Sequence, residues 1–211
     1  MNEFLSFLPG FLSAYGILII AASSPGPAVA LLLGICLGQG RTPALITTAG
    51  IASGGIVLNL ATLVGVGLIL EQAAWAMTAL RIIGATYLLW LAYAAFRKAV
   101  HPPNIQATSP PLQNFGQLFL TGFLLQITNP KAIVFWLAIA AIGATQGGGA
   151  GIVILFVIGA FIISFVCHGA WAILLSAAPF RAAYARARRW VEGILGMFFA
   201  YAAVQLAVSR A

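Results

Sequence analysis

The sequence is poor in charge, with only 6% of its 211 residues being Asp, Glu, Lys or Arg, and it contains no aspartate. A soluble globular domain carries about 25% charged residues, whereas 62% of this chain is hydrophobic. This composition excludes an ordinary soluble protein. It predicts an integral, all-α membrane protein in which residues 1–211 form a single transmembrane domain.

Several functional motifs are also missing. The chain has no P-loop, no G-x-S-x-G and no metal-binding histidine cluster, so we expect no ATP-driven step, no enzyme activity, no metal and no cofactor. Its two cysteines, Cys36 and Cys167, lie in apolar runs without C-x-x-C spacing and are predicted to be buried as small hydrophobes. The net charge is +7, but no basic stretch alternates with aromatic residues, so nucleic acid is not an expected partner.

Long apolar runs predict six spans of about 20 residues or more. They cover residues 11–38, 43–70, 74–96, 115–144, 150–176 and 190–208. The polar, proline-rich segment 99–114 is predicted to be a cytoplasmic linker between a first repeat, 11–98, and a second repeat, 115–208. The N-terminal residues 1–3 lack Lys and Arg, so we expect them to be the uncleaved start of the first span.

Positive charge sets the expected orientation. The first, third and fifth loops carry Arg41, Arg97 with Lys98, and the arginines of 181–189, and basic loops stay cytoplasmic. We therefore predict an inner (plasma) membrane protein with both termini outside, and a basic juxtamembrane helix over 181–190. Because each half has three spans, the second half enters the membrane in the opposite sense, which gives a 3+3 inverted repeat.

Two of the predicted spans are interrupted by proline. The first contains Ser24-Pro25-Gly26-Pro27, and the fourth contains Thr128-Asn129-Pro130-Lys131 at a matching place. Proline lacks an amide donor and disfavours helix at the residue before it. Irregular backbone at membrane depth is tolerated only inside protein or beside a wet cavity. A pair of broken spans, one in each half, therefore indicates the binding site of a secondary carrier.

The sequence also resembles the LysE/RhtB family of amino-acid exporters over nearly its whole length. The matching motifs are Ser24-Pro25-Gly26-Pro27, Gly84-Ala85-Thr86-Tyr87-Leu88-Leu89-Trp90-Leu91, Phe115, Gly122-Phe123-Leu124, Asn129-Pro130-Lys131-Ala132, Phe135-Trp136 and Gly196. The resemblance implies export of amino acids or close derivatives across the inner membrane, driven by the proton gradient. It does not indicate which amino acid is exported.

The breaks themselves offer binding groups for a zwitterion. The half-helix that begins at Pro27 is expected to present free amides to a carboxylate, and the one that ends before Pro25 free carbonyls to an ammonium group. A polar uncharged solute would also fit. The candidate substrate-binding residues are Ser24, Pro25, Gly26, Pro27, Asn59, Gln126, Thr128, Asn129, Pro130 and Lys131.

Three polar residues in the spans have two possible roles each. Lys131 either binds the substrate carboxylate or braces the carbonyls of the opposite break, because a charge at this depth needs a partner. Asn59 either binds substrate or forms an interhelical hydrogen bond. His168 is the candidate for carrying a coupled proton, although a buried histidine can also be purely structural.

Two other functions remain open from the sequence. A thiol-redox electron carrier would use Cys36 and Cys167, but these do not occupy equivalent places in the two halves. A cation or metal-ion transporter would want several oxygen ligands, and the spans hold no acid near their centres. Gly50 and Gly54 form a G-x-x-x-G that predicts close helix packing, and such small-residue faces permit a homodimer within the lipid bilayer.

Overall fold

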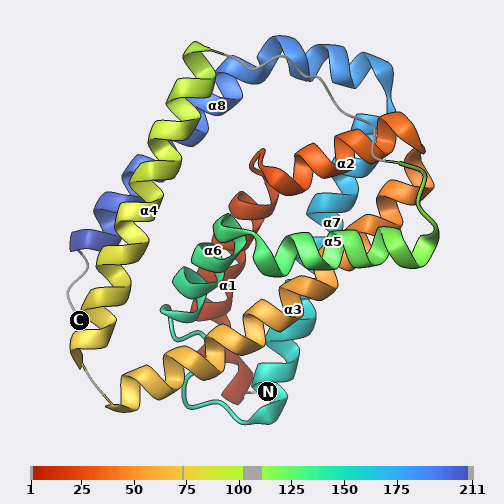
Figure 1. The fold of residues 1–211 in the computed structure, drawn as a ribbon. Helices are drawn as coiled ribbons and strands as arrows, with labels where there is room; N and C mark the ends of the chain where they lie inside the picture. Colours follow the sequence, from red (N-terminus) through yellow and green to blue (C-terminus); the bar gives the residue numbers. More distant parts are fainter. Residues whose placement is uncertain (1, 73, 102–110, 209–211) are drawn as a thin grey trace. The chain divides into compact units, whose positions relative to one another are not determined.

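The computed structural model describes residues 2–72, 74–101 and 111–208, and this part of the chain is helical apart from short connections (Figure 1). The predicted all-α class is confirmed. The helices are α1 (Asn2–Ser23), α2 (Pro27–Gly38), α3 (Arg41–Gln72), α4 (Ala74–Val100), α5 (Phe115–Thr128), α6 (Pro130–Ala140), α7 (Ala150–Ser176) and α8 (Ala178–Val208).

The chain forms two compact units, and each draws on both halves of the sequence. The first unit, Met1–Val66 with Ala107–Ala177, contains α1, α2, most of α3 and α5 to α7. The second unit, Gly67–Gln106 with Ala178–Ala211, contains α4 and α8. The predicted repeats 11–98 and 115–208 divide the sequence into two halves and do not coincide with these two units. The repeats stay a prediction.

Three helical segments in the described part are long and apolar enough to cross a membrane: Leu5–Ser23, Arg41–Gly65 and Ala150–Ser176. The pair α5 and α6, bent by 61° at its break, makes a fourth if it counts as one span. Helix α2 is apolar but only 12 residues long. The structure thus supports several crossings, and the total of six stays a prediction.

Some helix boundaries differ from the predicted spans. Helix α1 begins at Asn2 rather than at residue 11, and α4 continues to Val100, into the predicted linker, of which 102–110 lies outside the described residues. Helix α6 ends at Ala140 because the following turn contains Gly143 in the left-handed region, at φ +69°. Helix α8 begins at Ala178, so the arginine-rich segment and the predicted sixth span form one continuous helix.

In the first unit, α1 and α7 pack against each other through apolar residues that recur at helical spacing. Phe11, Ala14 and Leu18 of α1 are buried in one cluster with Phe156 and Ala160 of α7. The rings of Phe11 and Phe156 meet edge to face with centroids 5.0 Å apart. The opposite surface of α7 is exposed and apolar, as expected of a helix that faces lipid.

Helices α3 and α5 cross at very short range through glycines. A Cβ atom added to Gly50 would lie 2.0 Å from the carbonyl oxygen of Phe119, and one added to Gly122 would lie 2.2 Å from that of Thr47. Gly54 approaches Gln126 in the same way. The close packing predicted from the G-x-x-x-G spacing is confirmed, and it places Gln126 beside α3.

In the second unit, α4 and α8 pack along each other (Figure 1). Gly196 makes room for the ring of Phe96, to which an added Cβ would come within 2.7 Å. Glu192 is buried, and its Oε1 lies 3.9 Å from Nε of Arg188 one turn earlier. The negative charge of the Glu192 carboxylate thus lies near the positive charge of Arg188 on the same helix.

Candidate functional site

The first break separates α1 from α2. Ser24 closes the end of α1: its amide donates to the carbonyl of Ile20 (3.0 Å) and its hydroxyl to that of Ala21 (2.9 Å). Gly26 has an extended backbone, and Pro27 is the first residue of α2, where its missing amide costs nothing. No side chain caps α2, so its N-terminal amides are open to a ligand.

The second break separates α5 from α6 at Asn129. The amide of Asn129 donates to the carbonyl of Gln126 (3.3 Å), and its side-chain oxygen accepts from the amide of Lys131 (3.1 Å). Pro130 begins α6 in the same way that Pro27 begins α2. Both prolines therefore begin a new helix, as predicted, and the fourth predicted span is bent at its break. A first span broken at its middle stays a prediction, because α1 alone is long enough to cross a membrane.

The two breaks meet through Lys131. Its Nζ donates to the carbonyl oxygen of Ser24 at 2.9 Å and also to the Ser24 hydroxyl. Gly26 leaves space for this side chain, because an added Cβ would lie 3.2 Å from Nζ. Of the two predicted roles for Lys131, the bracing contact is present, and the lysine also lines the cavity described next.

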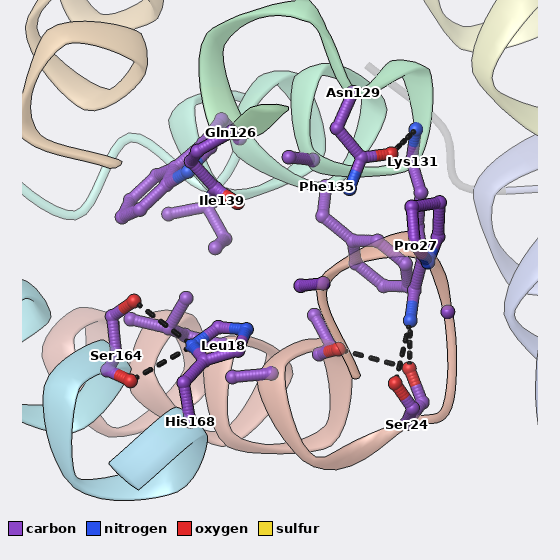
Figure 2. Close-up of a pocket in the computed structure, with 16 residues that line it drawn as sticks. Leu18, Ser24, Pro27, Gln126, Asn129, Lys131, Phe135, Ile139, Ser164 and His168 are labelled. Carbon is purple, nitrogen blue, oxygen red and sulfur yellow. Dashed lines mark hydrogen bonds between the residues drawn. The ribbon is translucent and has the colours of Figure 1, made fainter. Parts of the chain in front are cut away.

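A cavity lies between the breaks in the first unit (Figure 2). Its polar lining consists of Ser24, Gln126, Asn129, Lys131, Ser164 and His168, and its apolar lining includes Leu18, Phe135, Trp136 and Ile139. The centre of a water-sized solute can move over about 40 Å³, which is room for about three water molecules. No acidic side chain is among the lining residues.

One end of the cavity is rich in hydrogen-bond donors. Helices α2 and α6 both begin there, so two positive helix ends and the Lys131 ammonium group converge (Figure 2). The expectation of free carbonyls at the first break is wrong for this conformation. The Ser24 carbonyl accepts from Lys131, and the Ser23 carbonyl accepts from Nε1 of Trp171 (3.2 Å).

The other end holds His168, Ser164 and Gln126, away from Ser24 and Lys131 in Figure 2. His168 is 6% exposed, and its Nδ1 lies 2.9 Å from the carbonyl oxygen of Ser164 and 3.4 Å from the Ser164 hydroxyl. Gln126 Nε2 and Ser164 Oγ come within 3.9 and 4.0 Å of the position where Gly55 would carry a Cβ. These polar groups therefore gather beside α3.

The structure brings together most of the predicted site residues, but not all. The cavity is lined by Ser24, Gly26, Pro27, Gln126, Asn129, Lys131 and His168, whereas Pro25, Asn59, Thr128 and Pro130 do not line it. The Thr128 hydroxyl is exposed and donates to the carbonyl of Leu124 (2.7 Å) within its own helix. Ser164 was missed by the sequence analysis, although its spacing of four from His168 places both on one helix face.

Within the part of the chain that the structure describes, Asn59 of α3 does not form the interhelical hydrogen bond that was one of its two predicted roles, and it does not line the cavity. It is 1% exposed, and its side-chain nitrogen and oxygen make no hydrogen bond within the described residues. It lies one helical turn after Gly55, on the face that approaches the polar end of the cavity. An unpaired buried amide costs about 1–3 kcal/mol.

We expect Asn59→Leu to keep or raise the melting temperature of the purified protein and to lower transport at least tenfold. The substitution removes an unsatisfied amide at similar volume, while an intramembrane polar group is generally retained for function. Melting in detergent and flux in vesicles measure the two effects. Asn129→Leu is the matched control, because Asn129 caps α6 and its loss should destabilise. A destabilised Asn59→Leu variant would show that the amide has a structural partner.

Alternative chemistries find little support in the described residues. Among them, no group of three or more His, Cys, Asp or Glu side chains could hold a metal ion. Among the described residues Cys36 and Cys167 form no disulfide, and Cys36 donates to the carbonyl of Ala172 (3.3 Å). Cys36 is buried, as predicted, whereas the prediction is wrong for Cys167, which is only partly buried because it lies between the exposed Val166 and the buried His168 on α7.

Taken together, apolar spans and a central polar cavity between broken helices define a multi-pass membrane protein with the architecture of a carrier. The chain belongs to the LysE type translocator family, whose sequence profile matches residues 19–210. The family resemblance carried by the sequence motifs is confirmed. The protein is accordingly a transporter and not an enzyme.

Individual relatives are similar along most of the chain. A protein named threonine efflux protein from Escherichia coli (strain K12) is 30% identical over 206 residues, which cover 95% of this chain and 98% of the relative. A Salmonella typhi protein of the same name is 30% identical over 198 residues, covering 91% and 94%. A leucine efflux protein from Salmonella choleraesuis is 28% identical over 114 residues, or 54% and 53% of the two chains. No solved structure matches this chain.

Proposed function

We propose that this protein exports amino acids or close derivatives across the inner membrane in exchange for protons. The observation that carries the proposal is the meeting of the two breaks around one small polar cavity through the Lys131–Ser24 contact. Relatives named for threonine and leucine efflux support the substrate class. The proton gradient is proposed as the energy source because the chain has no nucleotide-binding motif.

The chemistry of the cavity fits the carboxylate of such a substrate. Lys131 and the positive ends of α2 and α6 lie at one end, where α2 also has uncapped amides, and no acidic side chain is among the lining residues. A substrate carboxylate is complementary in charge to this end of the cavity, and it would interact with Lys131 beside the Ser24 contact.

The narrow part of the cavity is small for a substrate. Space for about three water molecules is less than the five non-hydrogen atoms of the smallest amino acid require. We therefore propose that the cavity widens as substrate binds. In the proposed cycle the cavity opens alternately to the two sides, in a chain with six spans, an inverted repeat and both termini outside.

The direct test uses purified protein in lipid vesicles loaded with radiolabelled L-threonine or L-leucine. We expect an imposed proton gradient to accelerate amino-acid movement toward the acidic side, and a protonophore to abolish the acceleration. Vesicles without protein give the leak rate. If the gradient changes the flux of no amino acid in a broad panel, proton-coupled amino-acid export is wrong for this protein.

A further inference from the structure

His168 has one ring nitrogen committed to the protein and one open to the cavity. Nδ1 lies 2.9 Å from the Ser164 carbonyl oxygen, which can only accept a hydrogen bond, so Nδ1 carries the hydrogen. Nε2 of the neutral ring is therefore a lone-pair acceptor. Among the described residues nothing donates to it, and Figure 2 shows it on the side of the ring that faces away from Ser164.

The hydrogen-bond acceptors that line the cavity differ between its two ends. At the Lys131 end, the Ser24 oxygens accept from the lysine itself, and the Asn129 side-chain oxygen accepts from the Lys131 amide. At the other end, His168, Gln126 and Ser164 each carry a side-chain acceptor that faces no lysine. A zwitterion in this cavity thus finds donors for its carboxylate at one end and acceptors for its ammonium group at the other.

We propose that Nε2 of neutral His168 accepts a hydrogen bond from the substrate's α-ammonium group, and that a coupled proton competes for the same nitrogen. This inference rests on the proposed function and assigns the residue at which substrate and proton exclude each other. Protonated imidazole has donors at both nitrogens and no acceptor, so it cannot hold an ammonium group. Proton binding at Nε2 and substrate binding are therefore alternatives.

Electrostatic repulsion between a protonated His168 and the ammonium group of the substrate also opposes their simultaneous binding. The titratable groups that line the cavity are His168 from α7 and Lys131 from α6, while the lining residues of α1, α2 and α5 carry no titratable side chain. A proton on His168 would add a second positive charge beside an incoming ammonium group. In a transport cycle, a proton from the acidic outside would displace the amino acid there, and loss of that proton inside would restore the acceptor.

The test measures binding of L-threonine and L-leucine to the purified full chain between pH 3 and pH 8. For the wild type we expect affinity to fall about tenfold per pH unit below the titration of His168, because proton and substrate compete at one atom. His168→Gln retains an acceptor oxygen but cannot titrate, so its affinity should not depend on pH. His101→Gln, which changes the other histidine at the exposed end of α4, should behave as the wild type.

The 2-hydroxy analogues of both amino acids, which lack the ammonium group, provide a second measurement that does not depend on a variant. They should bind the wild type more weakly and lack its pH dependence. A His168→Gln protein that keeps the wild-type pH slope, or a hydroxy analogue that shows the same slope as its amino acid, would overturn the inference. In either case amino-acid binding would still stand, whereas a wild type that binds no amino acid would overturn the proposed function as well.

Discussion

Lys131→Met is expected to reduce amino-acid transport at least 100-fold while leaving the protein folded. The substitution removes the charge proposed to attract the substrate carboxylate and the contact that joins the two breaks. The substitution changes the free energy of unfolding in two opposite ways. Losing a hydrogen bond from a charged group costs about 1.5–3 kcal/mol, while removing a charge from the membrane interior returns about 2.5–3.5 kcal/mol. Melting in detergent and proton-driven flux in vesicles measure the two quantities.

Lys98→Met is the matched control for this experiment. Lys98 is the other lysine of the chain and lies in the last turn of α4, in the second unit and not among the residues that line the cavity. Its removal should leave the transport rate near that of the wild type. Equal transport by the Lys131→Met and wild-type proteins would show that substrate does not use the cavity between the breaks.

Gly50→Ala and Gly122→Ala are each expected to lower the melting temperature strongly and to reduce the yield of folded protein. The added methyl groups would overlap the carbonyl oxygens of Phe119 and Thr47, at 2.0 and 2.2 Å. Backbone atoms in a helix cannot move aside singly, so α3 and α5 must separate. Overpacking of this kind costs about 1–3 kcal/mol and occasionally more. Because Gln126 lies at this crossing, transport should fall even in the protein that folds.

Gly65→Ala on the same helix α3 separates this steric effect from a general effect of replacing glycine. No atom lies within 4 Å of the Cβ position at Gly65. Alanine there should leave the melting temperature unchanged or slightly raise it, because it favours helix by about 1 kcal/mol over glycine. Equal losses at Gly50 and Gly65 would contradict the close crossing of α3 and α5.

The helix breaks could be predicted closely because they are local. Pro27 and Pro130 act through their own ring geometry, whatever surrounds them, and each begins a helix where the sequence placed an interruption. Helix ends without proline were predicted less well. Residues 2–10 contain Pro9, yet α1 runs from Asn2 through this proline, and in α8 Pro179 falls in the first turn, where proline is tolerated. Neither helix therefore begins where its predicted span does, at residue 11 or 190.

The site was predicted in part. Polar residues next to the breaks were identified because position along the chain placed them there, and Ser24, Gln126, Asn129 and Lys131 do line the cavity. Thr128 was included for the same reason, but its hydroxyl bonds within its own helix. Ser164 was missed because a serine in an apolar span carries no signal until the histidine one turn later is seen to bind its carbonyl.

The sequence by itself determined a charge-poor membrane protein with two proline-broken helices, because composition and proline geometry act residue by residue. Only the tertiary structure decided that Lys131 donates hydrogen bonds to the oxygens of Ser24, 107 residues earlier in the chain. It also decided that His168 has a ring nitrogen without a protein donor among the described residues at the other end of the cavity. Which groups satisfy one another depends on how separate helices pack. That packing makes the Ser24 carbonyl, expected to be free, a partner of Lys131, and it makes the Ser23 carbonyl a partner of Trp171.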